Sequence, residues 1–233
     1  QVTSENASNI RGTWLKAGKL YYDAPTNTLT LENAEIKTQA YAILSYTEGL
    51  RIELIGENKI FSGRASSLYL SKKTTITGEG SLNVETTDNC GIFLPGSSLT
   101  IEDCTVTTKG KWGVAGNNST EAGKLLIKNA KLTAEGSNGS ICDMAELTLE
   151  GSYIKDPEGA AFDADLFAVA LGGQIVTEAI NIVPIHDGIT SAEMDTTNAQ
   201  SAVYTLSGTK VNTPINKLNK GIYIVNGKKL IVK

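Results

Sequence analysis

Apolar and polar residues alternate in short segments along most of the chain, and the segments repeat. Four eight-residue segments align without gaps, and two more align with one inserted residue. They start at Leu29, Ile52, Thr74, Leu99, Leu125 and Leu147. Successive starts lie 23, 22, 25, 26 and 22 residues apart. Where every second residue is apolar, one face of a strand points inward. Because the segments recur at a nearly constant interval, they predict a stacked solenoid.

A residue that tolerates a positive φ angle occupies the fifth position of every segment. This column consists of Asn33, Gly56, Gly78, Asp103, Asn129 and Gly151. Gly, Asn and Asp enter the left-handed region at lower cost than other residues. We therefore expect a sharp bend at the same corner of each coil, with the six residues above one another.

A shorter strand pattern recurs late in each unit. It covers Tyr41–Leu44, Ser67–Leu70, Gly91–Leu94, Trp112–Ala115, Ser140–Asp143 and Ala160–Asp163. Each coil therefore has three strand faces. Parallel crossovers are almost always right-handed. The pattern predicts an all-β fold, a right-handed parallel β-helix of about six coils.

Both ends of such a rod need a cover, because they would otherwise expose unpaired strand edges. We expect a β-hairpin to cap the front, a degenerate coil or cap at the back, and then a polar linker. A C-terminal β appendage follows, in which Asn226-Gly227 is a strong hairpin signal. The expected boundaries are 1–28 for the cap, 29–166 for the repeats, 167–186 for the last coil or cap, 187–200 for the linker and 201–233 for the tail.

Composition excludes several classes of function. The chain has 25 acidic against 21 basic residues, a net charge of −4, so it lacks the basic surface typical of nucleic-acid binding. No apolar run approaches the roughly 18 residues of a membrane span. We expect a monomer without membrane insertion.

Three cysteines and one histidine limit the available chemistry. The cysteines are interpreted as buried thiols that pack as small hydrophobic residues, although a Cys90–Cys104 bridge remains open. Cys104 occupies an inward position that holds Ala in other coils. The histidine, His186, falls in the expected linker.

Two acidic residues support an alternative function, that of an enzyme acting on polysaccharides. Asp143 and Asp163 end the short strands of consecutive coils, so they are expected to stack about 5 Å apart. Converging carboxylates serve glycoside hydrolases, and a polysaccharide lyase or hydrolase acting on an acidic polysaccharide is therefore one hypothesis. The other interpretation is ordinary surface acids at a loop edge.

Aromatic side chains favour binding instead. Tyr46, Tyr69 and Trp112 fall at or just beyond the short strands, where their rings could stack on sugars. Polar groups expected beside them are Asn117, Asp143 and Asp163. The alternative is that the rings only shield loop edges, which would suit a structural spacer.

Two stretches resemble known families. The run YYDAPTNTLTLENAEI and the repeated LTIEDCTV-type segments, over roughly residues 2–166, resemble uncharacterised β-helix surface proteins of gut Bacteroidetes and Clostridia, some of which are carbohydrate-binding-like. The tail AVYTLSGTKV…KGIYIVNGKKLIVK resembles the C-terminal sorting segments of exported Bacteroidetes proteins. The resemblance implies an extracellular or cell-surface protein whose signal peptide has been removed.

We expect a non-catalytic glycan-binding or adhesion module for a polysaccharide or surface glycan. No cofactor is expected, apart from calcium that could bridge an acidic glycan.

Overall fold

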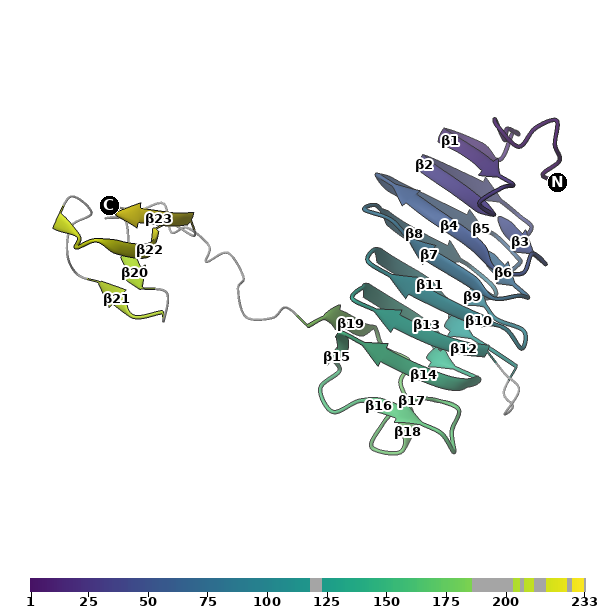
Figure 1. Cartoon of the computed structure of the whole chain (residues 1–233). Coiled ribbons are helices and arrows are strands. Elements are labelled where there is room, and N and C mark those ends of the chain that lie inside the picture. Colours follow the sequence, from purple (N-terminus) through teal and green to yellow (C-terminus); the bar gives the residue numbers. More distant parts are fainter. Residues whose placement is uncertain (118–122, 186–202, 206–207, 212–216, 226–227, 233) are drawn as a thin grey trace. The chain divides into compact units, whose positions relative to one another are not determined.

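The computed structural model describes residues 1–117, 123–185, 203–205, 208–211, 217–225 and 228–232. The chain divides into two compact units, Gln1–Ile185 and His186–Lys233. The first unit is a parallel β-helix of about five turns, in which strands of successive coils lie side by side (Figure 1). The predicted all-β parallel β-helix is confirmed.

The first face of the solenoid is a parallel stack of six strands. In order these are β2 (Thr28–Thr38), β4 (Leu50–Ile55), β7 (Thr74–Thr77), β10 (Ser98–Glu102), β12 (Gly123–Lys128) and β14 (Met144–Glu150). Every adjacent pair in this stack is parallel. Apolar residues at alternate positions of these strands point into the core, as the period-two pattern predicts.

The second and third faces follow the corner of each coil. The second face contains the end of β2, β5 (Glu57–Ser62), β8 (Ser81–Thr86), β11 (Thr105–Ala115) and β13 (Lys131–Cys142). The third face contains β3 (Ile43–Ser45), β6 (Leu68–Leu70), β9 (Cys90–Phe93) and the ends of β11 and β13. The three expected strand faces are present in the first five coils.

The corner residues all have positive φ angles. Their values are 49° for Asn33, 68° for Gly56, 114° for Gly78, 53° for Asp103, 46° for Asn129 and 59° for Gly151. The predicted bend at each corner is confirmed. Contacts between coils are close there, since a Cβ added to Gly56 would lie 2.1 Å from the Asn33 Oδ1 atom, and one added to Gly151 would lie 2.0 Å from the Asn129 Oδ1 atom.

The expected column is wrong at one step, between the second and third coils. The structure pairs Ile52 with Ile76 and not with Thr74. A Cβ added to Gly80 would lie 2.5 Å from the Gly56 carbonyl oxygen, so Gly80 and not Gly78 stacks on Gly56. The corner of the third coil is three residues long, between β7 and β8, whereas that of the second coil is one residue long. The longer corner lets the apolar side chains of both coils stay in register.

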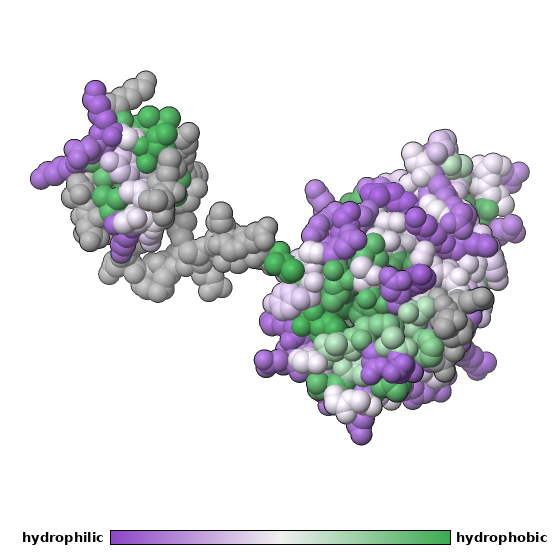
Figure 2. Space-filling model, turned by 60° about the horizontal axis from the view of Figure 1, so that its bottom comes forward, coloured by the Kyte–Doolittle hydropathy of each residue, from purple (hydrophilic) through white to green (hydrophobic). Residues whose placement is uncertain are grey.

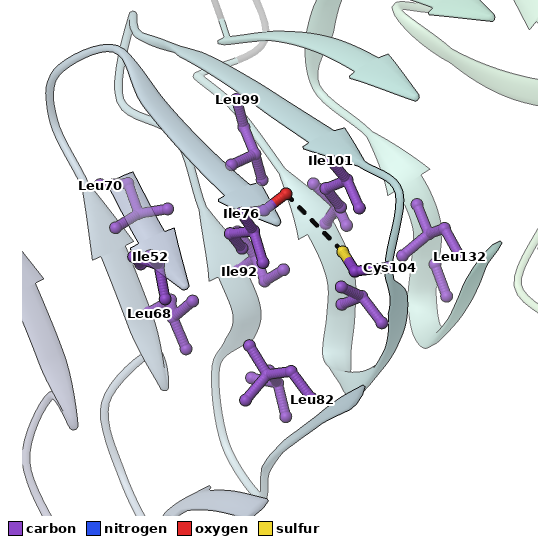
Figure 3. Packing of buried hydrophobic residues seen from close by; sticks show 14 of the residues in the cluster. Ile52, Leu68, Leu70, Ile76, Leu82, Ile92, Leu99, Ile101, Cys104 and Leu132 are labelled. Atoms are coloured by element: carbon purple, nitrogen blue, oxygen red, sulfur yellow. Dashed lines mark hydrogen bonds between the residues drawn. The ribbon is translucent and has the colours of Figure 1, made fainter. Parts of the chain in front are cut away.

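The core is a continuous column of aliphatic side chains. Ile52, Ile76 and Ile101 lie in one register on the first face and are fully buried. Figure 3 shows them with Leu68, Ile92 and others from the opposite wall, all pointing into the interior. Each coil therefore buries its apolar face against its neighbours, as expected of a solenoid.

Small residues after the corners also point inward and bind the neighbouring coil. Asn58 is 1% exposed, and its Oδ1 atom accepts a hydrogen bond of 2.8 Å from the backbone N–H of Ala34. The Ser152 hydroxyl oxygen accepts one of 3.3 Å from the Ala130 N–H. Cys104 donates its thiol to the Ile76 carbonyl oxygen at 3.6 Å (Figure 3). This slot thus links adjacent coils as well as filling space.

All three cysteines are buried free thiols. Their expected role as small hydrophobic residues is confirmed, and the Cys90–Cys104 bridge is not formed. Cys104 belongs to the main core, whereas Cys90 and Cys142 pack in a smaller cluster with Ala115 and Ala168.

The front of the solenoid is capped by the predicted hairpin. Strand β1 (Leu15–Asp23) pairs antiparallel with β2, and Leu20 lies opposite Leu31. The Tyr22 hydroxyl donates a 2.8 Å hydrogen bond to the Asn27 Oδ1 atom at the turn. Trp14 and Tyr22 pack against the core from this side.

The back of the solenoid is capped by strands that leave the parallel stack. β19 (Ile180–Pro184) inserts antiparallel between β13 and β15 (Ser152–Asp156). β16 (Ala161–Asp163), β17 (Ala168–Leu171) and β18 (Gln174–Ile175) form a separate antiparallel sheet. The sixth coil is therefore incomplete, because the expected third strand at 160–163 pairs with β17 and not with the coil before it. Figure 2 shows this end of the solenoid from outside, with apolar residues among hydrophilic ones. Leu171 and Ile175 of the cap are exposed.

The second unit contains a four-stranded antiparallel sheet. Its order is β21 (Lys210–Val211), β20 (Val203–Thr205), β22 (Gly221–Val225) and β23 (Lys228–Val232). Val225 pairs with Lys228, so β22 and β23 have the register expected of a two-residue hairpin. The residues at that turn, 226–227, lie outside the described residues, as do His186 and the expected linker 187–200.

Candidate functional site

The third face carries a group of exposed aromatic and aliphatic side chains, which we call the aromatic platform. It consists of Tyr41, Leu44, Tyr46, Tyr69 and Phe93. Tyr46 is 67% exposed, Leu44 47% and Tyr41 43%, whereas Tyr69 and Phe93 are half-buried. Exposed apolar side chains that gather in this way often mark a binding surface.

The four rings of the platform contact one another through Tyr69. Its ring centroid lies 5.3 Å from that of Tyr41, edge to face, and 6.1 Å from that of Tyr46. The Phe93 centroid lies 5.5 Å away on the other side. These separations fall in the range of favourable aromatic pairs, so the rings hold one another in place.

Strand register explains why these residues meet. Leu44, Tyr69 and Phe93 occupy the same register position on β3, β6 and β9. Their neighbours in sequence, Ile43 and Leu68, are buried in the core. Because successive side chains of a strand point to opposite faces, the aromatic residues must face outward.

In the coils that follow, small buried residues replace the large exposed ones at this register position. Phe93 is followed in register by Ala115 and then Cys142. Both are 2% exposed and pack with Cys90 and Ala168 in the smaller cluster. Small residues at these positions let the back cap cover this half of the third face. The platform is therefore confined to the first three coils.

The tyrosine hydroxyl groups of the platform are available to a ligand. Within the part of the chain that the structure describes, Tyr41, Tyr46 and Tyr69 make ring contacts but no hydrogen bond through their hydroxyls. A tyrosine combines an apolar ring with a polar tip. The platform thus offers flat apolar faces and three hydroxyl groups on one surface.

Two of the predicted binding residues meet and a third does not. Tyr46 and Tyr69 lie together in the platform. Trp112 packs instead against the smaller cluster, in the coil beyond Phe93, and is half-buried. Asn117 is exposed and directly precedes residues 118–122, which the structure does not describe.

The two predicted aspartates do not stack. Asp163 lies on β16 and pairs with Ala168, and its Oδ1 atom accepts the backbone N–H groups of Asp165 and Leu166. Asp143 follows β13 with a φ of 55°, and its Oδ2 atom accepts the Cys142 thiol at 3.7 Å. The expected equivalence is wrong because the chain leaves the parallel stack before β16. Asp163 has the structural role of closing a turn.

Among the described residues, none of the ionisable groups with a shifted pKa belongs to the platform, although Phe93 packs against the cluster that contains Cys90 and Cys142. Burial raises the pKa of the Cys90 thiol to about 11 and that of Cys104 to about 12. It also raises the pKa of Cys142, with a further contribution from the Asp143 carboxylate. Such thiols are protonated at neutral pH and unreactive. They serve packing and offer no nucleophile.

Surface hydrogen bonds and ion pairs account for two further pKa shifts. The hydroxyl of Thr148 and the ammonium of Lys124 lower the pKa of Glu146. The Glu135 carboxylate, 2.8 Å away, raises the pKa of Lys109. Both pairs join neighbouring coils, so these charges link strands.

Sequence reasoning missed Tyr41, Leu44 and Phe93. The signal was present, because the dipeptides Ile43-Leu44, Leu68-Tyr69 and Ile92-Phe93 each place an apolar residue before the outward one. Aligning the short strands by their buried Ile and Leu residues brings Leu44, Tyr69 and Phe93 together.

Comparison of the chain with protein-family models, with curated proteins and with solved structures finds no match. Among the described residues, no three His, Cys, Asp or Glu side chains are grouped closely enough to hold a metal ion. No helix in the described segments is long and apolar enough to cross a membrane.

Proposed function

We propose that the protein is a non-catalytic glycan-binding or adhesion module that acts at the cell surface or outside the cell. The observation that carries this proposal is the aromatic platform, in which four rings contact one another on an exposed face. Sugar rings have apolar C–H faces and polar edges. The former suit the rings of Tyr46 and Tyr69, and the latter suit the free tyrosine hydroxyls.

The shape of the platform favours a chain of sugars over a single small molecule. Its residues come from three successive coils, so it extends along the stack. Tyr69 and Phe93 lie on strands of the solenoid, and Tyr46 directly follows β3, so binding at these rings needs little reorganisation of the protein. An extended glycan could therefore lie across Tyr46, Tyr69 and Phe93.

The enzymatic alternative, a lyase or hydrolase, loses its main support. It rested on Asp143 and Asp163 at equivalent positions of consecutive coils, and Asp163 closes a turn in the back cap instead. The remaining alternative is a structural spacer, in which the platform rings only shield the edge of the third face.

The surface location is proposed from the resemblance of the repeats and the tail to exported bacterial proteins. The second unit, with its antiparallel sheet of β20–β23, would then serve sorting or anchoring.

A glycan array tests the proposal. The full chain is applied to neutral and acidic polysaccharides at modest salt, with calcium or with a chelator. Because the net charge is −4, acidic glycans are repelled unless calcium bridges them, so we expect neutral glycans to bind with or without chelator. Uniform absence of binding would contradict the proposal and favour the spacer.

A further inference from the structure

The front end of the solenoid contains an open depression of about 880 Å³. It lies where the first coil has a neighbouring coil on one side only. Its walls are interior side chains of that coil, among them Leu29 and Ile36, together with Leu50 of the second coil and the cap residues Ile10 and Leu20. In the coils further along, the corresponding interior space is filled by aliphatic side chains of the next coil.

The volume and the lining fit a small apolar molecule. Ligand sites in proteins measure about 300–1,000 Å³ and are lined mainly by apolar and aromatic side chains. Leu29, Ile36, Leu50, Ile10 and Leu20 are each less than 9% exposed, so they form a hydrophobic floor. Cavities of this composition bind apolar molecules better than water.

One cation, the exposed Arg11, lies at the rim of this depression, which polar residues such as Asn6 and Thr47 also line. Of the described residues around the depression, Arg11 is the one with a charged side chain. Its Nε–H donates a 2.9 Å hydrogen bond to the Asn9 Oδ1 atom, which orients the guanidinium group. In the described part of the chain no carboxylate pairs with it, so its Nη groups remain available. Guanidinium groups bind carboxylates and phosphates through two parallel hydrogen bonds.

We propose that this depression binds an anionic amphiphile with a single alkyl chain, such as a fatty acid. The chain lies against Leu29, Ile36 and Leu50, and the anionic head contacts Arg11. The site shares Tyr41, Leu44 and Tyr46 with the aromatic platform but includes neither Tyr69 nor Phe93. The inference therefore does not rest on glycan binding, and either can fail without the other.

The test uses the full chain with Trp112→Phe, which leaves Trp14 in the lining as the fluorescent reporter. Decanoate is titrated below the concentration at which it forms micelles, and 1-decanol of equal chain length is the neutral control. We expect saturable binding of decanoate, and roughly tenfold weaker binding of decanol because it lacks the charge-assisted hydrogen bonds. Equal binding of the two, or none of decanoate, would overturn the proposal.

Two variants locate the site. Arg11→Gln is expected to weaken decanoate binding roughly tenfold and leave decanol binding unchanged, whereas the matched control Arg64→Gln, an exposed arginine outside the depression, changes neither. Ala42→Phe places a ring inside the depression without adding a tryptophan and is expected to weaken binding of both. Since this second variant could disturb folding, its urea midpoint is measured alongside. Unchanged decanoate affinity in Arg11→Gln would refute the assignment whatever Ala42→Phe does.

Discussion

Replacing Gly151 by Ala tests directly whether the corner residues of adjacent coils stack. The new Cβ would lie 2.0 Å from the Asn129 Oδ1 atom in the neighbouring coil. Gly172 provides a matched control, because its φ of 60° nearly equals the 59° of Gly151, yet nothing lies within 4 Å of its added Cβ. Both substitutions therefore pay the same free-energy cost of placing alanine in the left-handed region. Only Gly151→Ala also creates a close contact with the neighbouring coil.

The expected magnitudes follow from this comparison. An alanine in the left-handed region costs ~1 kcal/mol of unfolding free energy, and this is the whole effect expected at Gly172. Forcing the Asn129 amide aside adds ~1–2 kcal/mol at Gly151, within the range for overpacked sites. Gly151→Ala should thus destabilise by ~2–3 kcal/mol in total.

A double-mutant cycle isolates the contact. Asn129→Gly keeps a residue that accepts the local φ of 46° and removes the amide. In that background Gly151→Ala should cost only ~1 kcal/mol, giving a coupling of ~1–2 kcal/mol. Urea unfolding is followed by tryptophan fluorescence, which reports on the solenoid alone because Trp14 and Trp112 both lie in it. Equal losses for Gly151→Ala and Gly172→Ala, or no relief from Asn129→Gly, would refute the stacked corner.

Two further predictions concern buried polar groups. Asn58→Ala leaves the buried N–H of Ala34 without its 2.8 Å partner, so it should lower the unfolding free energy by ~2–3 kcal/mol. The control Asn83→Ala removes an amide that bonds the exposed Glu85 carboxylate and should change the unfolding free energy by less than ~0.5 kcal/mol. Similar losses for the two variants in urea titrations would contradict this. The pKa of Cys104 is raised to about 12 from 9.0 in the folded state. Its unfolded thiol ionises first, so stability that is intact below pH 9 should fall between pH 9 and 12 by ~1.4 kcal/mol per pH unit. Cys104→Ala should remove this part of the slope, and an unchanged slope would contradict it.

The architecture could be predicted because local chemistry restricts it. Positive φ angles at Asn33, Asp103 and Asn129 follow from residue types that tolerate them, and the alternating apolar residues could face only inward. The register between the second and third coils could not be predicted in this way. Gly56, Gly78 and Gly80 all permit a corner, and the choice among them depends on how Ile52 packs against Ile76.

The candidate site was predictable only in part, because it depends on register and on capping. The positions of Tyr46 and Tyr69 near the short strands are enough to predict them as binding residues. Phe93 required knowledge that β9 lies directly beside β6. The position of Asp163 depends on antiparallel pairing with β17. The repeat pattern does not predict this pairing, because the cap interrupts the repeat.

Isothermal titration of a glycan selected on the array tests the aromatic platform most directly. Tyr69→Ala removes the ring that contacts the three others, while Tyr153→Ala removes an exposed tyrosine of β15, far along the stack. If a sugar covers on the order of 60 Å² of the Tyr69 ring, its loss costs ~1.5 kcal/mol, or about tenfold in affinity. We expect that loss for Tyr69→Ala and an unchanged affinity for Tyr153→Ala. Equal affinities for wild type and Tyr69→Ala would contradict binding at the platform.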